Sequence, residues 1–191
     1  MILPENLQKE LTLLTKIYKV VNIYLTGSRS YQNNSENSDY DFIVIVENMN
    51  VDRIEKKFYN GTIFVFRKPN WEKKLKEHDV SALECYFLPQ EFKIKEDWKY
   101  SLKLDLSLLK TKFCAKAQKS YSKAEKFKNS IESEKDELIK NKNLYHALRI
   151  LFFMRQILDY NKIIDYTEAN NFSLTEDNYK QIFADLFNLG K

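Results

Sequence analysis

The chain has 191 residues, of which 43% are hydrophobic and 30% charged, and its net charge is +4. This length supports one sizeable core, or a small core with a helical extension, and the composition excludes a chain that is disordered throughout. Cys85 and Cys114 are too few for a disulfide framework, and neither a signal-type N-terminus nor a run of about 18 apolar residues occurs. We therefore expect a cytoplasmic globular protein that does not enter a membrane.

The first hundred residues alternate between helical and strand patterns. Leucines recur at helical spacing after Pro4, a residue that suits the first turn of a helix. The elements predicted after this first helix are a strand at 20–25, a short helix or turn at 28–34, a strand at 41–46, a helix at 51–59 and a strand at 62–66. Such alternation predicts a small α/β sheet.

From residue 70 onward the pattern is almost wholly helical. The predicted helices are one or two over 70–88, a long one along the apolar stripe from Leu109 to Ile131, another from Leu144 to Leu158, and a last one beginning near Thr175. Residues 101–162 carry 14 basic and 7 acidic side chains, which suits either contact with a polyanion or a solvated helix face. We expect an α/β core at 1–100 and a helical C-terminal lobe at 101–191.

One of the three glycines, Gly27, directly follows the predicted strand 20–25 and its neighbour Thr26. A glycine lets the backbone turn sharply and approach a ligand, and the amides at a following helix start point toward an anionic group such as a phosphate. A glycine in this place is also common in ordinary turns.

Two acidic residues, Asp39 and Asp41, open the predicted strand 41–46. Alternate side chains of a strand share one face and lie about 6.6 Å apart, so these carboxylates can converge on a divalent metal. The same pattern also occurs at solvated strand edges. Together with the glycine turn, however, it indicates a triphosphate cradle beside a metal site.

The segment LTGSRS at 25–30, followed by SDYDFIV at 38–44, resembles the signature of the DNA-polymerase-beta-like nucleotidyltransferase superfamily. In that family a Gly-Ser pair precedes an Asp-x-Asp strand. Two further segments, ALECYFLP at 82–89 and KNLYHALR at 142–149, resemble parts of predicted nucleotidyltransferases of bacteria and their phages. The resemblance implies a small mixed sheet flanked by helices, with a helical C-terminal lobe.

The resemblance also implies a reaction and a set of roles. Such enzymes move a nucleoside monophosphate from a nucleoside triphosphate (NTP) to an acceptor hydroxyl and release pyrophosphate, with two Mg²⁺ ions. Asp39 and Asp41 would bind the metals, because Mg²⁺ prefers carboxylate and phosphate oxygens. The nucleotide, ATP among the candidates, would be bound by Gly27, Ser28, Arg29 and Ser30.

A third acidic residue, which the superfamily usually carries on a later strand, is missing from the predicted strand 62–66. Among the acids that follow, we expect Glu84 to complete the catalytic set, because it lies in an apolar stretch that matches the family. An ordinary polar helix position is the alternative. Asp79 suits a helix cap instead.

A helical face of the second half carries Lys142, His146 and Arg149, which could contact a triphosphate or an acceptor phosphate, or form a plain helix surface. His78 lies among charged residues and is expected at the surface. Trp71, Trp98 and most Tyr and Phe residues are expected in the core rather than as base-stacking platforms.

The sequence therefore predicts a nucleotidyltransferase whose acceptor is an RNA end, a small molecule or a protein hydroxyl. The alternative is a catalytically degenerate module of the same fold that binds nucleotide, nucleic acid or a protein partner. No pattern in the sequence indicates the oligomeric state or the nucleobase of the NTP.

Overall fold

The structure is a computed structural model that describes residues 3–33, 38–58, 60–128, 134–172 and 176–189. The chain forms two compact units. The first contains the described residues up to Glu77 together with Cys85–Leu102, and the second contains His78–Glu84 and the described residues from Lys103 onward. None of the described helices is long and apolar enough to cross a membrane.

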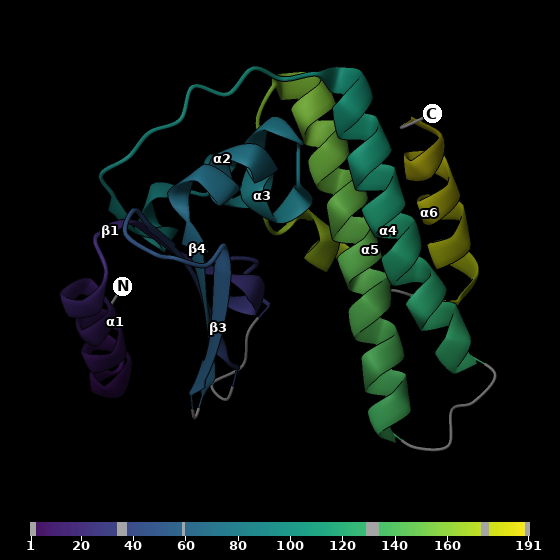
Figure 1. Cartoon of the computed structure of the whole chain (residues 1–191). Helices are drawn as coiled ribbons and strands as arrows, with labels where there is room; N and C mark the ends of the chain where they lie inside the picture. The colour runs from purple at the N-terminus through teal and green to yellow at the C-terminus, as the bar shows by residue number, and fades with distance from the viewer. Residues whose placement is uncertain (1–2, 34–37, 59, 129–133, 173–175, 190–191) are drawn as a thin grey trace. The chain divides into compact units, whose positions relative to one another are not determined.

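The first unit is built on a mixed five-stranded sheet (Figure 1). Its strands are β1 (Val20–Thr26), β2 (Tyr40–Val46), β3 (Arg53–Phe58), β4 (Gly61–Arg67) and β5 (Lys93–Glu96). They lie in the order β3-β4-β2-β1-β5; the neighbours β2 and β4 pair in parallel, and the other neighbouring pairs are antiparallel. The strands predicted at 20–25, 41–46 and 62–66 thus form the centre of the sheet.

Helix α1 (Glu5–Ile17) packs on one face of this sheet, as Figure 1 shows. Its buried leucines, Leu7, Leu11 and Leu14, contact alternate strand residues such as Phe42 and Val44. Because successive strand side chains point to opposite faces, Asp41 and Ile43 face away from α1. The candidate site residue of β2, Asp41, therefore lies on the face of the sheet opposite to α1.

The helix predicted at 51–59 is wrong, because this segment contains the edge strand β3. Residue 59 lies outside the described residues. In β3 the partly buried residues Ile54, Lys56 and Phe58 alternate with exposed ones, a period of two that fits a strand. Antiparallel pairing with β4 and an ion pair between Lys56 and Glu10 of α1 fix the strand in place.

The predicted helical stretch 70–88 forms two helices, α2 (Lys68–Lys76) and α3 (Val80–Phe87). Trp71 of α2 is buried as expected, and its ring lies 5.0 Å from that of Phe66 on β4. A single turn, η2 (Gln90–Phe92), leads into β5, a strand that the sequence pattern did not predict.

The second unit is helical. It contains α4 (Leu106–Lys128), α5 (Glu134–Tyr160), the turn η3 (Glu168–Asn171) and α6 (Glu176–Leu189). Helices α4 and α5 lie side by side (Figure 1). Helix α6 contacts α5, and its Phe183 stacks on Tyr121 of α4. Among the positions used for the predictions, residue 34, Ile131 and Thr175 lie outside the described residues.

His78 is buried, with 2% of its surface exposed, so its predicted surface position is wrong. Its Nε2 accepts a hydrogen bond from the backbone N–H of Asp105, at 2.9 Å. The neighbouring Asp79 caps α3 as predicted, because its Oδ1 accepts a hydrogen bond from the N–H of Ala82, at 3.2 Å.

The expected α/β (α+β) class, a small mixed sheet flanked by helices with a helical C-terminal part, is confirmed. The division into an α/β core at 1–100 and a helical C-terminal lobe at 101–191 stays a prediction.

Gly61 offers a test of the sheet, because a Cβ atom at this position would lie 1.9 Å from the carbonyl oxygen of Tyr40, its partner on β2. Gly61→Ala is expected to lower the free energy of unfolding by about 2 kcal/mol or more, since the backbone of β2 must move. Urea unfolding measures the loss. Thr62→Ala on the same strand is the control, and an equally small effect of both substitutions would contradict the register.

Candidate functional site

The backbone turns sharply where β1 ends. Thr26 is still extended, Gly27 has a φ of +75°, and residues Gly27–Arg29 form the single turn η1. A positive φ of this size is one that glycine adopts readily and other residues adopt at a cost. The glycine therefore permits the chain to leave β1 at this point.

The turn lies directly against the carboxylate of Asp41. Thr26 and Asp41 are partners in the antiparallel pair of β1 and β2, and the Thr26 hydroxyl donates a hydrogen bond to the Asp41 carbonyl oxygen at 3.1 Å. A Cβ atom built on Gly27 would lie 2.9 Å from Oδ2 of Asp41. The structure thus brings together Gly27 and Asp41, and the lack of a side chain at residue 27 permits the turn to lie this close to the carboxylate.

Arg29 holds the turn to the segment that leads into β2. Its Nη2 donates a hydrogen bond to the carbonyl oxygen of Ser38 at 2.6 Å, and its guanidinium lies 3.5 Å from the centre of the Tyr40 ring. Such a cation–π contact adds about 0.5–2 kcal/mol. The sequence pattern indicated a phosphate contact for Arg29, and did not reveal this link.

Ser28 and Ser30 lie on the same turn. Ser30 is buried, and its hydroxyl donates a hydrogen bond to the Gly27 carbonyl oxygen at 2.9 Å. Ser28 is partly exposed. Their predicted contacts with a nucleotide stay predictions, and the structure gives Ser30 a clear part in shaping the turn.

The two aspartates differ in exposure. Asp41 is partly buried at the start of β2, whereas Asp39 is exposed and precedes the strand. Two carboxylates two residues apart suit Mg²⁺, which takes one or two protein carboxylates and fills its remaining positions with water and phosphate oxygens. In the described parts of the chain, no three His, Cys, Asp or Glu side chains gather into a metal-binding group.

The position beside Asp41 on the next strand is occupied by Thr62, because β2 and β4 pair in parallel with Asp41 opposite Thr62. On the far side of Thr62, the partner on β3 is Lys57. Four paired residues thus cross the sheet here: Thr26, Asp41, Thr62 and Lys57. Besides Asp41, none of the four carries a carboxylate. Sequence analysis predicted that this strand lacks an acid, and the register shows which residue stands there.

Glu84 lies on α3 and is partly exposed. Its backbone carbonyl accepts a hydrogen bond from the Tyr166 hydroxyl at 2.6 Å. It belongs to the second unit, whereas Asp39 and Asp41 belong to the first. Its catalytic role stays a prediction.

Lys142, His146 and Arg149 lie on α5 in the second unit, at spacings of four and three residues. Lys142 is exposed, and Arg149 is 5% exposed. Burial, together with the charges of Arg149, Lys116, Lys123 and Lys142, lowers the pKa of His146 to about 4. His146 is therefore neutral at pH 7 within a group of cations, while the predicted phosphate contacts of the three residues stay predictions.

The turn can be tested by adding a methyl group to it. Gly27→Ala is expected to cost about 1–2 kcal/mol of unfolding free energy, because alanine must adopt a positive φ and its Cβ meets Asp41 Oδ2. Chemical denaturation checks this value, with Ser28→Ala as the matched control. A Gly27→Ala protein as stable as the control would show that the turn is not built in this way.

His146 gives a pH dependence with a definite sign. The pKa of His146 is about 4 in the folded chain, below the ordinary 6.5. As the pH falls from about 6.5 to about 4, the unfolded chain therefore binds a proton that the folded chain does not bind. The free energy of unfolding decreases over this pH range. His146→Gln is expected to remove this loss, which is at most about 3 kcal/mol. Unfolding free energies at pH 7 and at about pH 4 measure it, and an identical pH dependence of both proteins would refute the assignment.

Comparison with known proteins agrees with this geometry. The sequence profile of the family described as "Nucleotidyltransferase domain" matches residues 7–105, more than half of the chain. No curated protein matches the chain. Among solved structures, the spectinomycin adenyltransferase AAD(9) from Enterococcus faecialis, determined with ATP and spectinomycin, is similar in fold. Its TM-score is 0.50 at 14% identity, over 95% of this chain and 88% of that chain.

A nucleotidyltransferase-like protein from Exiguobacterium sibiricum 255-15 also matches, with a TM-score of 0.38 and 11% identity, over 96% of this chain and 65% of that chain. This chain therefore spans about two thirds of the length of that protein. At such identities a structural likeness shows the fold alone, whereas the profile match shows the family. The chain belongs to the nucleotidyltransferase domain family.

Proposed function

We propose that this protein transfers a nucleoside monophosphate from an NTP to an acceptor hydroxyl, with Mg²⁺ held by Asp39 and Asp41. The observation that carries the proposal is the close approach of the Gly27–Arg29 turn to Asp41, at which a Cβ on Gly27 would lie 2.9 Å from Oδ2 of the carboxylate. Family membership supports the transferase class.

In the proposed reaction, the acceptor oxygen forms a bond to the α-phosphorus while the bond from that phosphorus to the pyrophosphate oxygen breaks. The acceptor proton passes to a carboxylate, for which we propose Glu84. Mg²⁺ at Asp39 and Asp41, two ions by family resemblance, would offset the charge on the reacting oxygens and keep them in line.

The turn η1 would hold the triphosphate through its backbone amides and the Ser28 hydroxyl. Arg29 positions this turn, because it links it to Ser38 and Tyr40. Lys142, His146 and Arg149 are proposed to contact phosphate groups of the nucleotide or acceptor. In this proposal residues 1–100 carry the chemistry, and residues 101–191 shape the acceptor site.

More than one NTP and more than one acceptor fit the proposed reaction. ATP is the first NTP to test, because the adenyltransferase with a similar fold was determined with ATP. An RNA end, a small molecule and a protein hydroxyl all present the required acceptor group. We place the activity in the cytoplasm, in keeping with a chain that has only two cysteines, both buried.

A second candidate function is favoured by Thr62, which occupies the position next to Asp41 where a further carboxylate would assist the transfer. Two carboxylates can bind a metal–nucleotide complex without turning it over. In this reading the protein is a binding module for nucleotide, nucleic acid or a protein partner.

Turnover of α-labelled NTPs with Mg²⁺, followed as pyrophosphate and labelled product, tests the leading proposal. Asp41→Asn is expected to lower turnover at least about 100-fold, because metal binding contributes several kcal/mol to the reaction. Asp52→Asn, which removes an exposed carboxylate outside the site, is the control. Equal activity of both variants would contradict the proposal.

Two further variants separate the candidates. If Glu84 accepts the proton, Glu84→Gln lowers turnover while nucleotide binding persists. If the wild-type protein binds Mg²⁺–NTP without turnover, and Thr62→Glu restores turnover, the protein is the degenerate binding module.

A further inference from the structure

A cavity of about 300 Å³ lies within the first unit, over β1 and the edge strand β5. This volume is at the small end of the range for ligand sites. Five of its lining residues are aromatic: Tyr24, Trp71, Tyr86, Trp98 and Tyr100. The other lining residues are Leu75, Lys93, Glu96 and Lys99.

The cavity extends along β1 away from Gly27, from Tyr24, three residues before Gly27, to Trp98 beside Asn22. Strand β5 runs antiparallel to β1, and beyond it both the N–H and the carbonyl oxygen of Trp98 bind the side chain of Asn22, near the start of β1. Lys68, whose Nζ lies 5.1 Å from the centre of the Trp98 ring, also lies 3.7 Å from Glu47, which follows β2. Asp41 is at the beginning of β2, about 20 Å of strand from Glu47, whereas the near wall of the cavity, Tyr24, pairs with Ile43, two residues from Asp41. The two sites share no lining residue.

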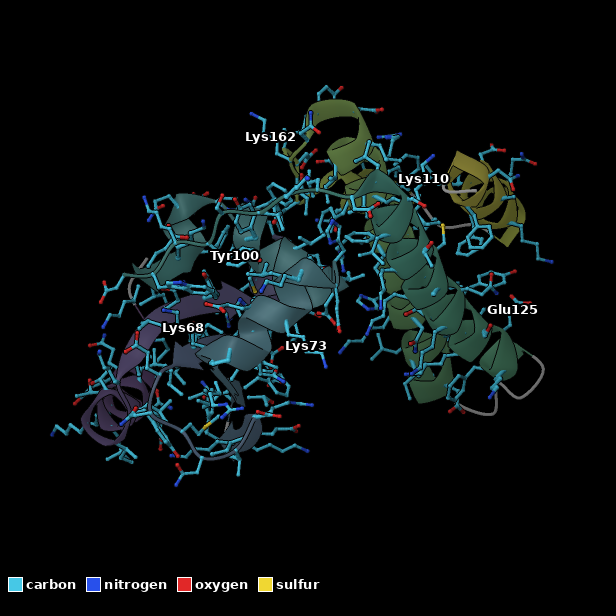
Figure 2. All side chains as sticks on the ribbon, turned by 45° about the horizontal axis from the view of Figure 1, so that its top comes forward. Lys68, Lys73, Tyr100, Lys110, Glu125 and Lys162 are labelled. Carbon is cyan, nitrogen blue, oxygen red and sulfur yellow. The ribbon has the colours of Figure 1, made fainter. Side chains whose placement is uncertain are left out.

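The aromatic walls suit a flat ring. Trp98 and Tyr100 have ring centres 5.9 Å apart at an angle of 56° (Tyr100 and Lys68 are labelled in Figure 2). Stacking on such rings is attractive for any planar π-system. The buried Tyr24 hydroxyl accepts a hydrogen bond from the Asn22 amide at 2.6 Å, and burial raises its pKa, so it keeps a proton that it can donate.

The charges disfavour a cation, the usual guest of an aromatic cage. Glu96 is paired with Lys93 at 2.7 Å, and both side chains are largely shielded, with 19% and 12% exposed. Lys68 already lies over one face of Trp98. Lys99 is exposed and makes no ion pair with the residues that the structure describes, so the lining has a net charge of +1.

We propose that this cavity is a binding site, separate from the Gly27–Asp41 site, for a small planar aromatic compound that carries one negatively charged group. The ring would lie among Trp98, Tyr100 and Tyr86, and the anionic group would meet Lys99. A nucleotide and a non-nucleotide aromatic acid share this chemistry.

The chain contains its own reporter for this site, because its 2 tryptophans, Trp71 and Trp98, both line the cavity. Tryptophan fluorescence of the full chain is titrated with 8-anilino-1-naphthalenesulfonate, then with AMP and with uncharged adenosine. The proposal expects saturable quenching by the sulfonate. Its displacement by AMP would mark a nucleotide as the natural ligand, and the lack of displacement would mark a non-nucleotide acid.

Variants make the test specific. Lys99→Glu is expected to weaken binding of the sulfonate at least about fivefold, because it reverses the charge that meets the anion. Lys9→Glu, a reversal at an exposed position on α1, and Asp41→Asn in the other site should leave it unchanged. Tyr100→Ala should weaken it through loss of stacking.

The proposal is overturned if the sulfonate leaves tryptophan fluorescence unchanged at millimolar concentration, if Lys99→Glu and Lys9→Glu bind it equally well, or if Asp41→Asn abolishes binding. These results do not depend on NTP turnover, so a failure here is distinct from a failure of the proposed transfer reaction.

Discussion

The missing side chain of Gly27 is the constraint on which the site depends. The antiparallel pairing of β1 and β2 places Thr26 opposite Asp41, so the residue after Thr26 must turn away directly beside the carboxylate. A residue with a Cβ would have to adopt a positive φ there and would meet Oδ2 at 2.9 Å. The loop and the acid therefore lie side by side because of strand register, and Arg29 holds the loop to the segment before β2 through Ser38.

The proposed nucleotide binding by the first unit has more support than the proposed turnover. Asp39 and Asp41 would supply oxygen ligands of the kind that Mg²⁺ prefers, and the triphosphate itself would complete the shell. The neighbouring strand, however, presents Thr62 beside Asp41, and a threonine hydroxyl neither carries charge nor accepts a proton at neutral pH. The distinction between enzyme and binding module therefore depends on whether Glu84, from another part of the chain, supplies the base.

The sequence predicted the three central strands of the sheet, where the strand-forming pattern of the residues and their burial in the fold agree. The glycine after a buried strand and the acid at the start of the next strand both lie where the pattern indicated, although the contact between Gly27 and Asp41 follows from register, which a sequence does not show. The segment 51–59 was misread as a helix because its charged residues mask a period-two pattern in a half-exposed edge strand. Burial of His78 was missed because its partner, the backbone N–H of Asp105, is distant in sequence.

The central claim is that Gly27 and Asp41 form one pocket for a metal–triphosphate complex. The most direct measurement is a crystal structure with Mg²⁺ and a non-hydrolysable ATP analogue. The account predicts triphosphate oxygens at the amides of the Gly27–Arg29 turn and a metal ion bound by Asp41. A bound analogue elsewhere on the protein, with no metal at Asp41, would contradict it.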